Sequence, residues 1–261
     1  MNIPVNRFKQ ELRAGRQLIG LWSSLSSAAA TEILCDSGFD WILIDTEHAP
    51  NETPMVADQL RAASLGSAVP IVRPAWNDPV TLKRLLDVGV QTVLVPYVQS
   101  AEEAARAVAA TRYPPAGVRG VASVHRANRY GRVADYFTRA DDEMCVLVQL
   151  ETRPAVDALE SIAAVEGVDG VFIGPSDLAA SLGHAGNNGH PEVRRMIEDA
   201  CRRARAVGKP IGILAPVESD ARAWLDMGFA FVAVGSDIVV LRKGCDALVA
   251  LFKGSPRPRG T

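Results

Sequence analysis

Two carboxylates, Glu151 and Asp177, each stand at the end of an apolar segment, CVLVQLE and GVFIGPSD. If these consecutive segments are neighbouring parallel strands, their ends lie about 5 Å apart and the two acids could share one divalent cation. An oxygen-only pair with further positions open to water suits Mg²⁺ or Mn²⁺ and tolerates Co²⁺. The residues alone leave an alternative open, in which each acid caps a helix or pairs with an arginine; Asp177 before LAASLG is well placed as an N-cap.

Basic side chains occupy similar positions in two other segments. Arg73 ends the apolar run in PIVRP, where a buried guanidinium needs an anionic partner. That partner could be a carboxylate of the protein, in a structural ion pair, or a substrate oxygen that becomes negative in the transition state. His48 lies three residues after Asp45 in DTEHAP. A lone histidine is more often structural, but beside a carboxylate in a loop it is also suited to general-base work.

Eight short apolar segments provide the elements that would position these groups. Strands that are covered on both faces are apolar at nearly every position, as TVLVP and GVFIGP are. Eight such strands alternating with helices predict an α/β fold, a (β/α)₈ TIM barrel, with its chemistry at the carboxyl ends of the strands. The segments are LIGLW (18–22), WILID (41–45), PIVRP (70–74), TVLVP (92–96), CVLVQLE (145–151), GVFIGPSD (170–177), PIGILA (210–215) and FVAVGSD (231–237).

Helical patterns separate these strands. Four are clear, at 28–38, 79–89, 101–112 and 190–208. Asp78 is the expected N-cap of the second, with Pro79 at its first position, and glycines end several of them. Each helix is long enough for a right-handed crossover between parallel strands.

Length and composition agree with one barrel of about 250 residues. The 261 residues predict a single domain over 1–254 and a disordered tail over 255–261. With 48% hydrophobic and 22% charged residues and a net charge of −2, the chain resembles an ordinary soluble protein with no field to recruit nucleic acid or membranes. The apolar runs are too short to span a bilayer, and the N-terminus lacks a secretory pattern, so we expect a cytoplasmic protein.

Two further expectations concern the cysteines and one long connection. The cysteines lie far apart without a CxxC motif, which predicts buried free thiols at Cys35, Cys145, Cys201 and Cys245. The basic segment 113–143 is long for a connection within a compact domain. We expect it to cover the active face; a subunit contact or a plain surface insertion are the alternatives.

Several longer motifs carry a resemblance to a known family. FDWILIDTEHAPN, VRPAWNDP, LLDVGVQTVLVPYV, ATRYPPAGVRGV, CVLVQLETR and VEGVDGVFIGPSDLAASLG resemble the HpcH/HpaI aldolase family, over roughly residues 8 to 253. The resemblance implies a class II pyruvate aldolase, which uses a divalent metal and neither a lysine Schiff base nor an organic cofactor. It implies reversible cleavage of a 4-hydroxy-2-oxo acid, such as 4-hydroxy-2-oxoheptanedioate, to pyruvate and an aldehyde such as succinic semialdehyde.

The resemblance also implies roles for individual residues. Glu151 and Asp177 match the family's metal ligands, and Arg73 matches the arginine that contacts the pyruvate carbonyl oxygen. His48 matches the acid–base histidine, and Asp45 and Asp87 match acids grouped with it. The backbone amides of Ser176 and Asp177 match those that receive the pyruvate carboxylate. Strand-end neighbours complete the substrate-binding set: Trp22, Gln149, Gly174 and Leu214. Relatives often carry Gly and Ala in place of Thr46 and Ser176, which puts no role in doubt.

Asp87 is unusual because it lies at the C-terminal end of its helix, at the wrong end of the barrel for its own site. If it acts with His48, it reaches the site of a neighbouring subunit. The resemblance accordingly implies a homo-oligomer, a hexamer. Three alternatives remain open: a 2-keto-3-deoxy sugar acid aldolase of the glucarate or rhamnonate type, a citrate lyase or malyl-CoA lyase type of enzyme, and a barrel that binds a 2-oxo acid without turnover. Arg126, Arg129 and Arg132 leave room for the coenzyme A reading.

Overall fold

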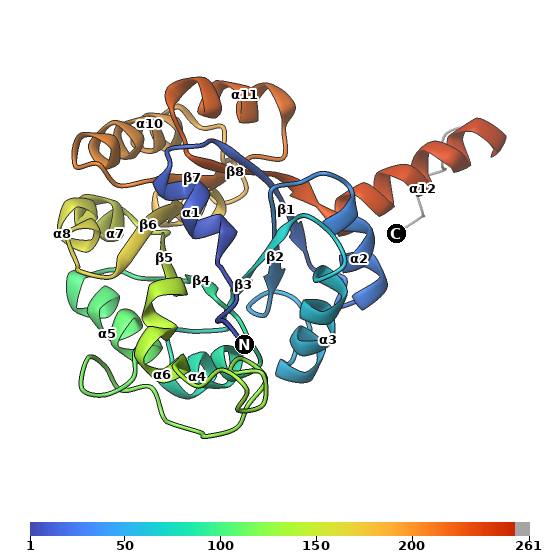
Figure 1. Ribbon diagram of the computed structural model, residues 1–261. Coiled ribbons are helices and arrows are strands. Elements are labelled where there is room, and N and C mark those ends of the chain that lie inside the picture. Colours follow the sequence, from blue (N-terminus) through green and yellow to red (C-terminus); the bar gives the residue numbers. More distant parts are fainter. Residues whose placement is uncertain (254–261) are drawn as a thin grey trace.

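The computed structural model describes residues 1–253, and they form a closed barrel of eight parallel strands surrounded by helices (Figure 1). Each strand pairs with the next along the chain, and β8 closes the barrel on β1. The predicted fold class is therefore confirmed. The strands are β1 (Leu18–Ser23), β2 (Trp41–Asp45), β3 (Val69–Arg73), β4 (Thr92–Val95), β5 (Cys145–Leu150), β6 (Val168–Ile173), β7 (Ile211–Leu214) and β8 (Phe231–Ser236).

Helices fill the connections. They are α1 (Arg7–Arg13), α2 (Ala28–Asp36), α3 (Thr53–Ala63), α4 (Pro79–Asp87), α5 (Ala101–Thr111), α6 (Tyr136–Arg139), the 3₁₀ helix η1 (Ala140–Glu143), α7 (Arg153–Asp157), α8 (Leu159–Ala163), α9 (Pro175–Ser181), α10 (Pro191–Ala206), α11 (Glu218–Met227) and α12 (Asp237–Lys253). The Asp78 side chain accepts from the Thr81 backbone N–H, so Asp78 is the N-cap of α4 as predicted. All four clearly predicted helices are confirmed, within two residues at either end.

Aromatic rings close the amino-terminal end of the barrel. Phe8, from α1, meets Trp41 and Phe231 edge to face, with ring centroids 6.1 and 5.7 Å apart. These rings need small neighbours, because a Cβ at Gly20 would lie 2.2 Å from Trp41. Because these rings fill the interior of the barrel at this end, polar side chains inside the barrel gather at the carboxyl ends of the strands.

The segment 113–143 does not cover the active face, so that expectation is wrong. It follows α5 and precedes β5, and such a helix-to-strand connection begins and ends at the amino-terminal end of the barrel. Contacts fix it there: the Ala127 N–H donates to the Asp87 carbonyl, and the Lys9 ammonium donates to carbonyls of Asp141 and Asp142. The expectation overlooked that a helix, already predicted at 101–112, precedes the segment, so that the segment joins a helix to the next strand.

The last helix, α12, projects away from the barrel (Figure 1). Its apolar residues Leu248, Leu251 and Phe252 are exposed, and so is Cys245. The prediction of buried thiols holds for Cys35, Cys145 and Cys201 but is wrong for Cys245, because no element within residues 1–253 packs over that part of α12. Within the described residues, no helix combines the length and apolar character needed to cross a bilayer. The tail predicted as disordered, 255–261, lies outside the described residues.

Candidate active site

A buried arginine joins two acidic side chains at the carboxyl ends of β2 and β3. Asp45 and Arg73 are the last residues of these strands and stand opposite each other in register. The Nε and Nη2 of Arg73 donate to the two carboxylate oxygens of Asp45 at 2.9 and 2.6 Å. Its Nη1 lies 2.8 Å from Oε2 of Glu47. The guanidinium is thus held by a bidentate fork that a lysine could not reproduce.

The charge of Arg73 decides the direction of the pKa shift for Asp45 but not for Glu47. Burial alone would raise the pKa of Asp45, but the hydrogen bonds and charge of Arg73 outweigh it and lower the pKa. For Glu47, burial prevails over the attraction of Arg73 and raises the pKa, with the charges of Asp45 and Asp177 acting in the same direction. Asp45 is therefore the permanent counter-ion of Arg73, and Glu47 belongs to a second, acidic group.

That acidic group centres on Glu151, which directly follows β5 and is 3% exposed. Its pKa is raised to about 8 by burial and by the nearby charges of Glu47 and Asp177. Over residues 1–253, its buried Oε1 has no hydrogen-bond partner. The same holds for Oε1 of Gln149, two residues earlier on β5. Buried oxygens that lack donors, beside carboxylates that repel one another, form an arrangement that a cation would stabilise.

Asp177 lies on α9, which follows β6. It is not the N-cap, as one alternative reading supposed: the helix begins at Pro175, Gly174 holds the cap position, and Asp177 stands in the first turn. In the part of the chain that the structure describes, neither Asp177 nor Glu151 forms an ion pair with an arginine, which weakens the structural alternative for both. Ser176 and Asp177 are exposed at this helix start, and the Ser176 hydroxyl accepts a hydrogen bond from the Asn188 amide at 3.1 Å.

Gly174 has a steric role beside these acids. A Cβ at this position would lie 2.8 Å from Cγ of Glu151 and 2.9 Å from Nε2 of Gln149, closer than side chains tolerate. Glycine therefore lets the turn after β6 approach the two β5 side chains.

We expect Gly174→Ala to lower kcat about tenfold or more, because the methyl group displaces Glu151 or Gln149. The matched control is Gly244→Ala on α12, where an added Cβ meets nothing within 4 Å. Steady-state kinetics and thermal melting of both variants check this. Wild-type kcat in Gly174→Ala would show that the close approach is unimportant.

Apolar strand-end residues form the floor of the site. The Trp22 Nε1–H points to Oδ2 of Asp45 at 3.3 Å, and the Arg73 guanidinium lies 5.2 Å from the Trp22 ring centre. Trp22 also packs on Phe172, and Leu214, half-buried at the end of β7, packs against the same inner core. The structure thus brings both to the same end of the barrel as Asp45 and Arg73.

His48 borders this group in the loop after β2. Its backbone N–H donates to Oδ1 of Asp45 at 3.4 Å, whereas its side chain is 66% exposed and lies 3.9 Å from Glu47, measured from Nε2 to Oε2. The imidazole is therefore free to meet a ligand or another chain. Its side-chain neighbour is Glu47, which the sequence interpretation missed. The only available signal was position: Glu47 is the acid between Asp45 and His48 in DTEHAP.

Asp87 does not join these residues within one chain. It ends α4 just before β4 begins, at the amino-terminal end of the barrel. Its Oδ1 accepts from Nη2 of Arg119 at 3.1 Å, and the Arg119 side chain is almost fully buried. The structure therefore separates Asp87 from His48 in the same subunit, as the sequence led us to expect.

Comparisons with known proteins give this arrangement a context. The chain is 56% identical to a pyruvate aldolase of Rhizobium etli over 252 residues, which cover 97% of this chain and 99% of that protein. It is 56% identical to a 4-hydroxy-2-oxo-heptane-1,7-dioate aldolase of Klebsiella pneumoniae over 95% of this chain and 94% of that protein. A solved HpcH/HpaI aldolase/citrate lyase family protein from Burkholderia cenocepacia superposes with a TM-score of 0.91 at 40% identity, covering 95% of this chain and 99% of that one. The HpcH/HpaI aldolase/citrate lyase family model matches residues 18–243, and the chain belongs to this family.

Proposed function

We propose that this protein is a divalent-metal-dependent pyruvate aldolase, a lyase that reversibly cleaves a 4-hydroxy-2-oxo acid to pyruvate and an aldehyde. 4-Hydroxy-2-oxoheptanedioate, which gives succinic semialdehyde, is the proposed substrate because it is the one that the curated relatives' names specify. The observation that carries the proposal is the acidic group of Glu47, Glu151 and Asp177 beside the fixed Arg73.

The donor set fits a divalent cation such as Mg²⁺, Mn²⁺ or Co²⁺. Glu151 and Asp177 would hold it, since Oε1 of Glu151 is buried without a hydrogen-bond partner over residues 1–253, and the charge of Asp177 helps to raise the pKa of Glu151. A bound cation would supply Lewis-acid stabilisation of a 2-oxo acid's carbonyl oxygen. Glu47, whose pKa is also raised by burial and by the charge of Asp177, adds negative charge to this group.

Arg73 would stabilise negative charge on the enolate oxygen that cleavage of the C3–C4 bond leaves on pyruvate. A guanidinium has five N–H groups, of which three face Asp45 and Glu47. Two remain to donate to substrate. Because Asp45 fixes the plane of the guanidinium, these donors are oriented before substrate arrives and need no reorganisation.

Proton transfer at the C4 hydroxyl is assigned to His48, and carboxylate binding to the start of α9. The exposed imidazole of His48, with Glu47 nearby, would accept the hydroxyl proton during cleavage and return it during aldol addition. The backbone N–H groups of Ser176 and Asp177 stand in the first turn of α9, where no carbonyl within the helix accepts them. They would receive the carboxylate of the 2-oxo acid, with Trp22, Gln149, Gly174 and Leu214 around it.

The substrate range distinguishes this proposal from the 2-keto-3-deoxy sugar acid aldolases. Purified enzyme should cleave 4-hydroxy-2-oxoheptanedioate with release of pyruvate, which is followed by coupled reduction to lactate. In the synthetic direction, succinic semialdehyde, tartronate semialdehyde and lactaldehyde are compared by kcat/KM with pyruvate as partner. Hydrophobic pockets separate one-carbon differences weakly, so only a large preference would name the aldehyde. Absence of pyruvate release from every 4-hydroxy-2-oxo acid would contradict the proposal.

The residues that left room for a citrate lyase or malyl-CoA lyase type of enzyme do not lie near the acidic group. Arg126, Arg129 and Arg132, which left room for a coenzyme A groove, lie with the segment 113–143 at the amino-terminal end of the barrel, opposite the acidic group. Addition of an acyl-CoA to the assay should therefore leave product formation unchanged.

Asp87 is proposed to complete the site of a neighbouring subunit in a homo-oligomer, a hexamer. Co-assembly of inactive His48→Ala and Asp87→Ala chains should then restore part of the activity, because some interfaces would join an intact His48 to an intact Asp87. The control is co-assembly of His48→Ala with Arg73→Ala, which should restore nothing because both residues belong to the same chain's site. Monomeric sedimentation with full turnover would contradict the shared site, as would failure of proven mixed oligomers to regain activity.

A further inference from the structure

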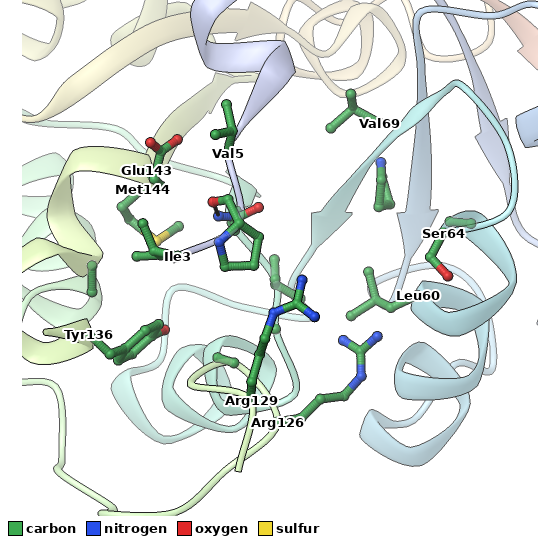
Figure 2. A pocket seen from close by; sticks show the side chains of 18 of the residues that line it. Ile3, Val5, Leu60, Ser64, Val69, Arg126, Arg129, Tyr136, Glu143 and Met144 are labelled. Atoms are coloured by element: carbon green, nitrogen blue, oxygen red, sulfur yellow. Dashed lines mark hydrogen bonds between the residues drawn. The ribbon is translucent and has the colours of Figure 1, made fainter. Parts of the chain in front are cut away.

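A cavity of about 630 Å³ lies at the amino-terminal end of the barrel, opposite the acidic group. Four parts of the chain enclose it: the first seven residues, the stretch from Leu60 at the end of α3 to Pro70 in β3, the residues Gly89–Gln91 just before β4, and the segment from Arg119 to Met144. Figure 2 shows apolar side chains of Ile3, Val5, Leu60 and Val69 around it. Its volume is in the range of cavities that hold a small organic molecule.

The charges around this cavity are strongly one-sided. Five arginines line it and only one acid, Glu143, does so; the arginines are Arg7, Arg119, Arg126, Arg129 and Arg132. The Glu143 carboxylate already accepts from the Asn6 N–H at 2.6 Å. Among residues 1–253, Arg126, Arg129 and Arg132 form no ion pair with a carboxylate. Burial lowers the pKa of Arg126, and the neighbouring charges of Arg61 and Arg129 act in the same direction.

One guanidinium presents a donor that the described chain does not use. Arg119 is 3% exposed, and its plane lies over the Tyr113 ring at 4.4 Å from the centroid. Its Nη2 donates to Asp87, whereas its Nε–H finds no acceptor anywhere in residues 1–253. A buried N–H of a charged group without an acceptor is costly, which favours an additional anionic partner at this position.

Arg126 and Arg129 lie in or beside a strained turn that hydrogen bonds hold in place. Arg129 and Tyr130 have φ angles of 52° and 57°, a region that non-glycine residues rarely adopt. The buried Asn128 maintains the turn: its Oδ1 accepts from the N–H groups of His125 and Gly131, and its Nδ2 donates to the Ser123 carbonyl. Figure 2 shows the side chains of Arg126 and Arg129 extending into the cavity. Such strain persists where the surroundings enforce it, often at binding sites.

We propose that this cavity is a binding site for a small organic anion, at the opposite end of the barrel from this chain's own acidic group. Arg126 and Arg129 grip its phosphate or carboxylate oxygens, and the Nε–H of Arg119 donates to the same group. The apolar part of the anion packs against Ile3, Val5, Leu60 and Val69. Guanidinium groups suit this task because their planar donors match both kinds of oxyanion.

The test is calorimetric titration of the intact, full-length protein, freed of metal so that anions cannot bind through a cation at the acidic group. Phenyl phosphate and phenylacetate are titrated separately at constant ionic strength, because they share an apolar body and differ in the oxyanion. We expect one site per chain for at least one of them. The probe that binds with the lower Kd identifies whether the cavity prefers a phosphate or a carboxylate.

Variants then locate the site. Arg126→Gln and Arg129→Gln should each raise Kd about tenfold or more, the effect of losing a hydrogen bond to a charged group. Arg129 is exposed, so its variant remains informative if loss of Arg126 disturbs folding. Arg222→Gln, the same change at an exposed arginine of α11, should leave Kd unchanged, and so should Arg73→Ala.

Three outcomes would overturn the proposal. Binding that is lost in Arg73→Ala but kept in Arg126→Gln and Arg129→Gln would place the anion at the aldolase site. Equal weakening in Arg222→Gln would indicate a general charge effect. Absence of binding of either probe to the wild-type protein would mean that the cavity accepts no small anion, for instance because carboxylates of a second copy of the chain fill it.

Discussion

Replacing Arg73 by alanine is expected to lower kcat by the order of 10²-fold or more, the effect seen when an oxyanion donor is removed. Within residues 1–253, only the guanidinium of Arg73 lies between Asp45 and Glu47. Its remaining N–H donors are therefore oriented before the substrate binds. Steady-state cleavage of 4-hydroxy-2-oxoheptanedioate measures the loss. The substitution also leaves Asp45 buried without its partner, so circular dichroism and thermal melting must show that the variant is folded.

A second measurement separates the enolate role from simple damage. Exchange of the pyruvate methyl protons with solvent should slow together with cleavage, because both reactions pass through the same enolate. Arg73→Lys should recover little, since an ammonium cannot form the fork to Asp45 and still donate to substrate. Proton exchange at the wild-type rate in a folded Arg73→Ala protein would exclude the enolate role.

Removal of divalent metal is expected to abolish cleavage, and Mg²⁺, Mn²⁺ or Co²⁺ is expected to restore it. Glu151→Gln should have nearly the same effect as chelation, because it keeps the shape of the side chain but removes the charge that would bind the cation. The matched control is Glu166→Gln, whose side chain is 95% exposed and belongs to the turn before β6. Activity assays before and after dialysis against a chelator, with elemental analysis, provide the measurement.

Metal binding also has a readout that is independent of turnover. A ligand that binds only the folded protein raises its Tm, so Mg²⁺ or Mn²⁺ should stabilise the wild type and Glu166→Gln but not Glu151→Gln. Full activity in protein without detectable metal would refute the class II assignment. Trapping of a lysine–pyruvate adduct by borohydride would refute it as well.

Patterns local to the chain were sufficient for the fold and for much of the site. The eight apolar runs, the Asp78 cap and the glycine stops depend on burial and backbone preferences that act over a few residues. In a parallel barrel the ends of all strands meet at one face, so Asp45, Arg73 and Glu151 could be grouped from sequence as soon as the strands were recognised. The same rule placed Asp87 at the opposite end.

Relations between side chains could not be predicted in this way. Glu47 is one of 30 acidic residues, and nothing local distinguishes it; only the path of the loop after β2 brings its carboxylate to Arg73 and His48. The side chain of Asp177 was interpreted as a possible cap, but the helix begins two residues earlier, at Pro175. The segment 113–143 is a different case, because its place follows from the helix that precedes it and that helix was already predicted at 101–112.

The sequence by itself determined the barrel, the end of it that gathers the acids, and the residue types available for chemistry, because hydrophobic period and strand order are properties of short stretches. The tertiary structure alone decided which carboxylate neutralises Arg73, which oxygens of Glu151 and Gln149 are left without donors, and that five arginines surround one cavity at the other end. These facts depend on distances between residues far apart in the chain, and such distances are set only when the barrel closes and excludes water from the groups inside it.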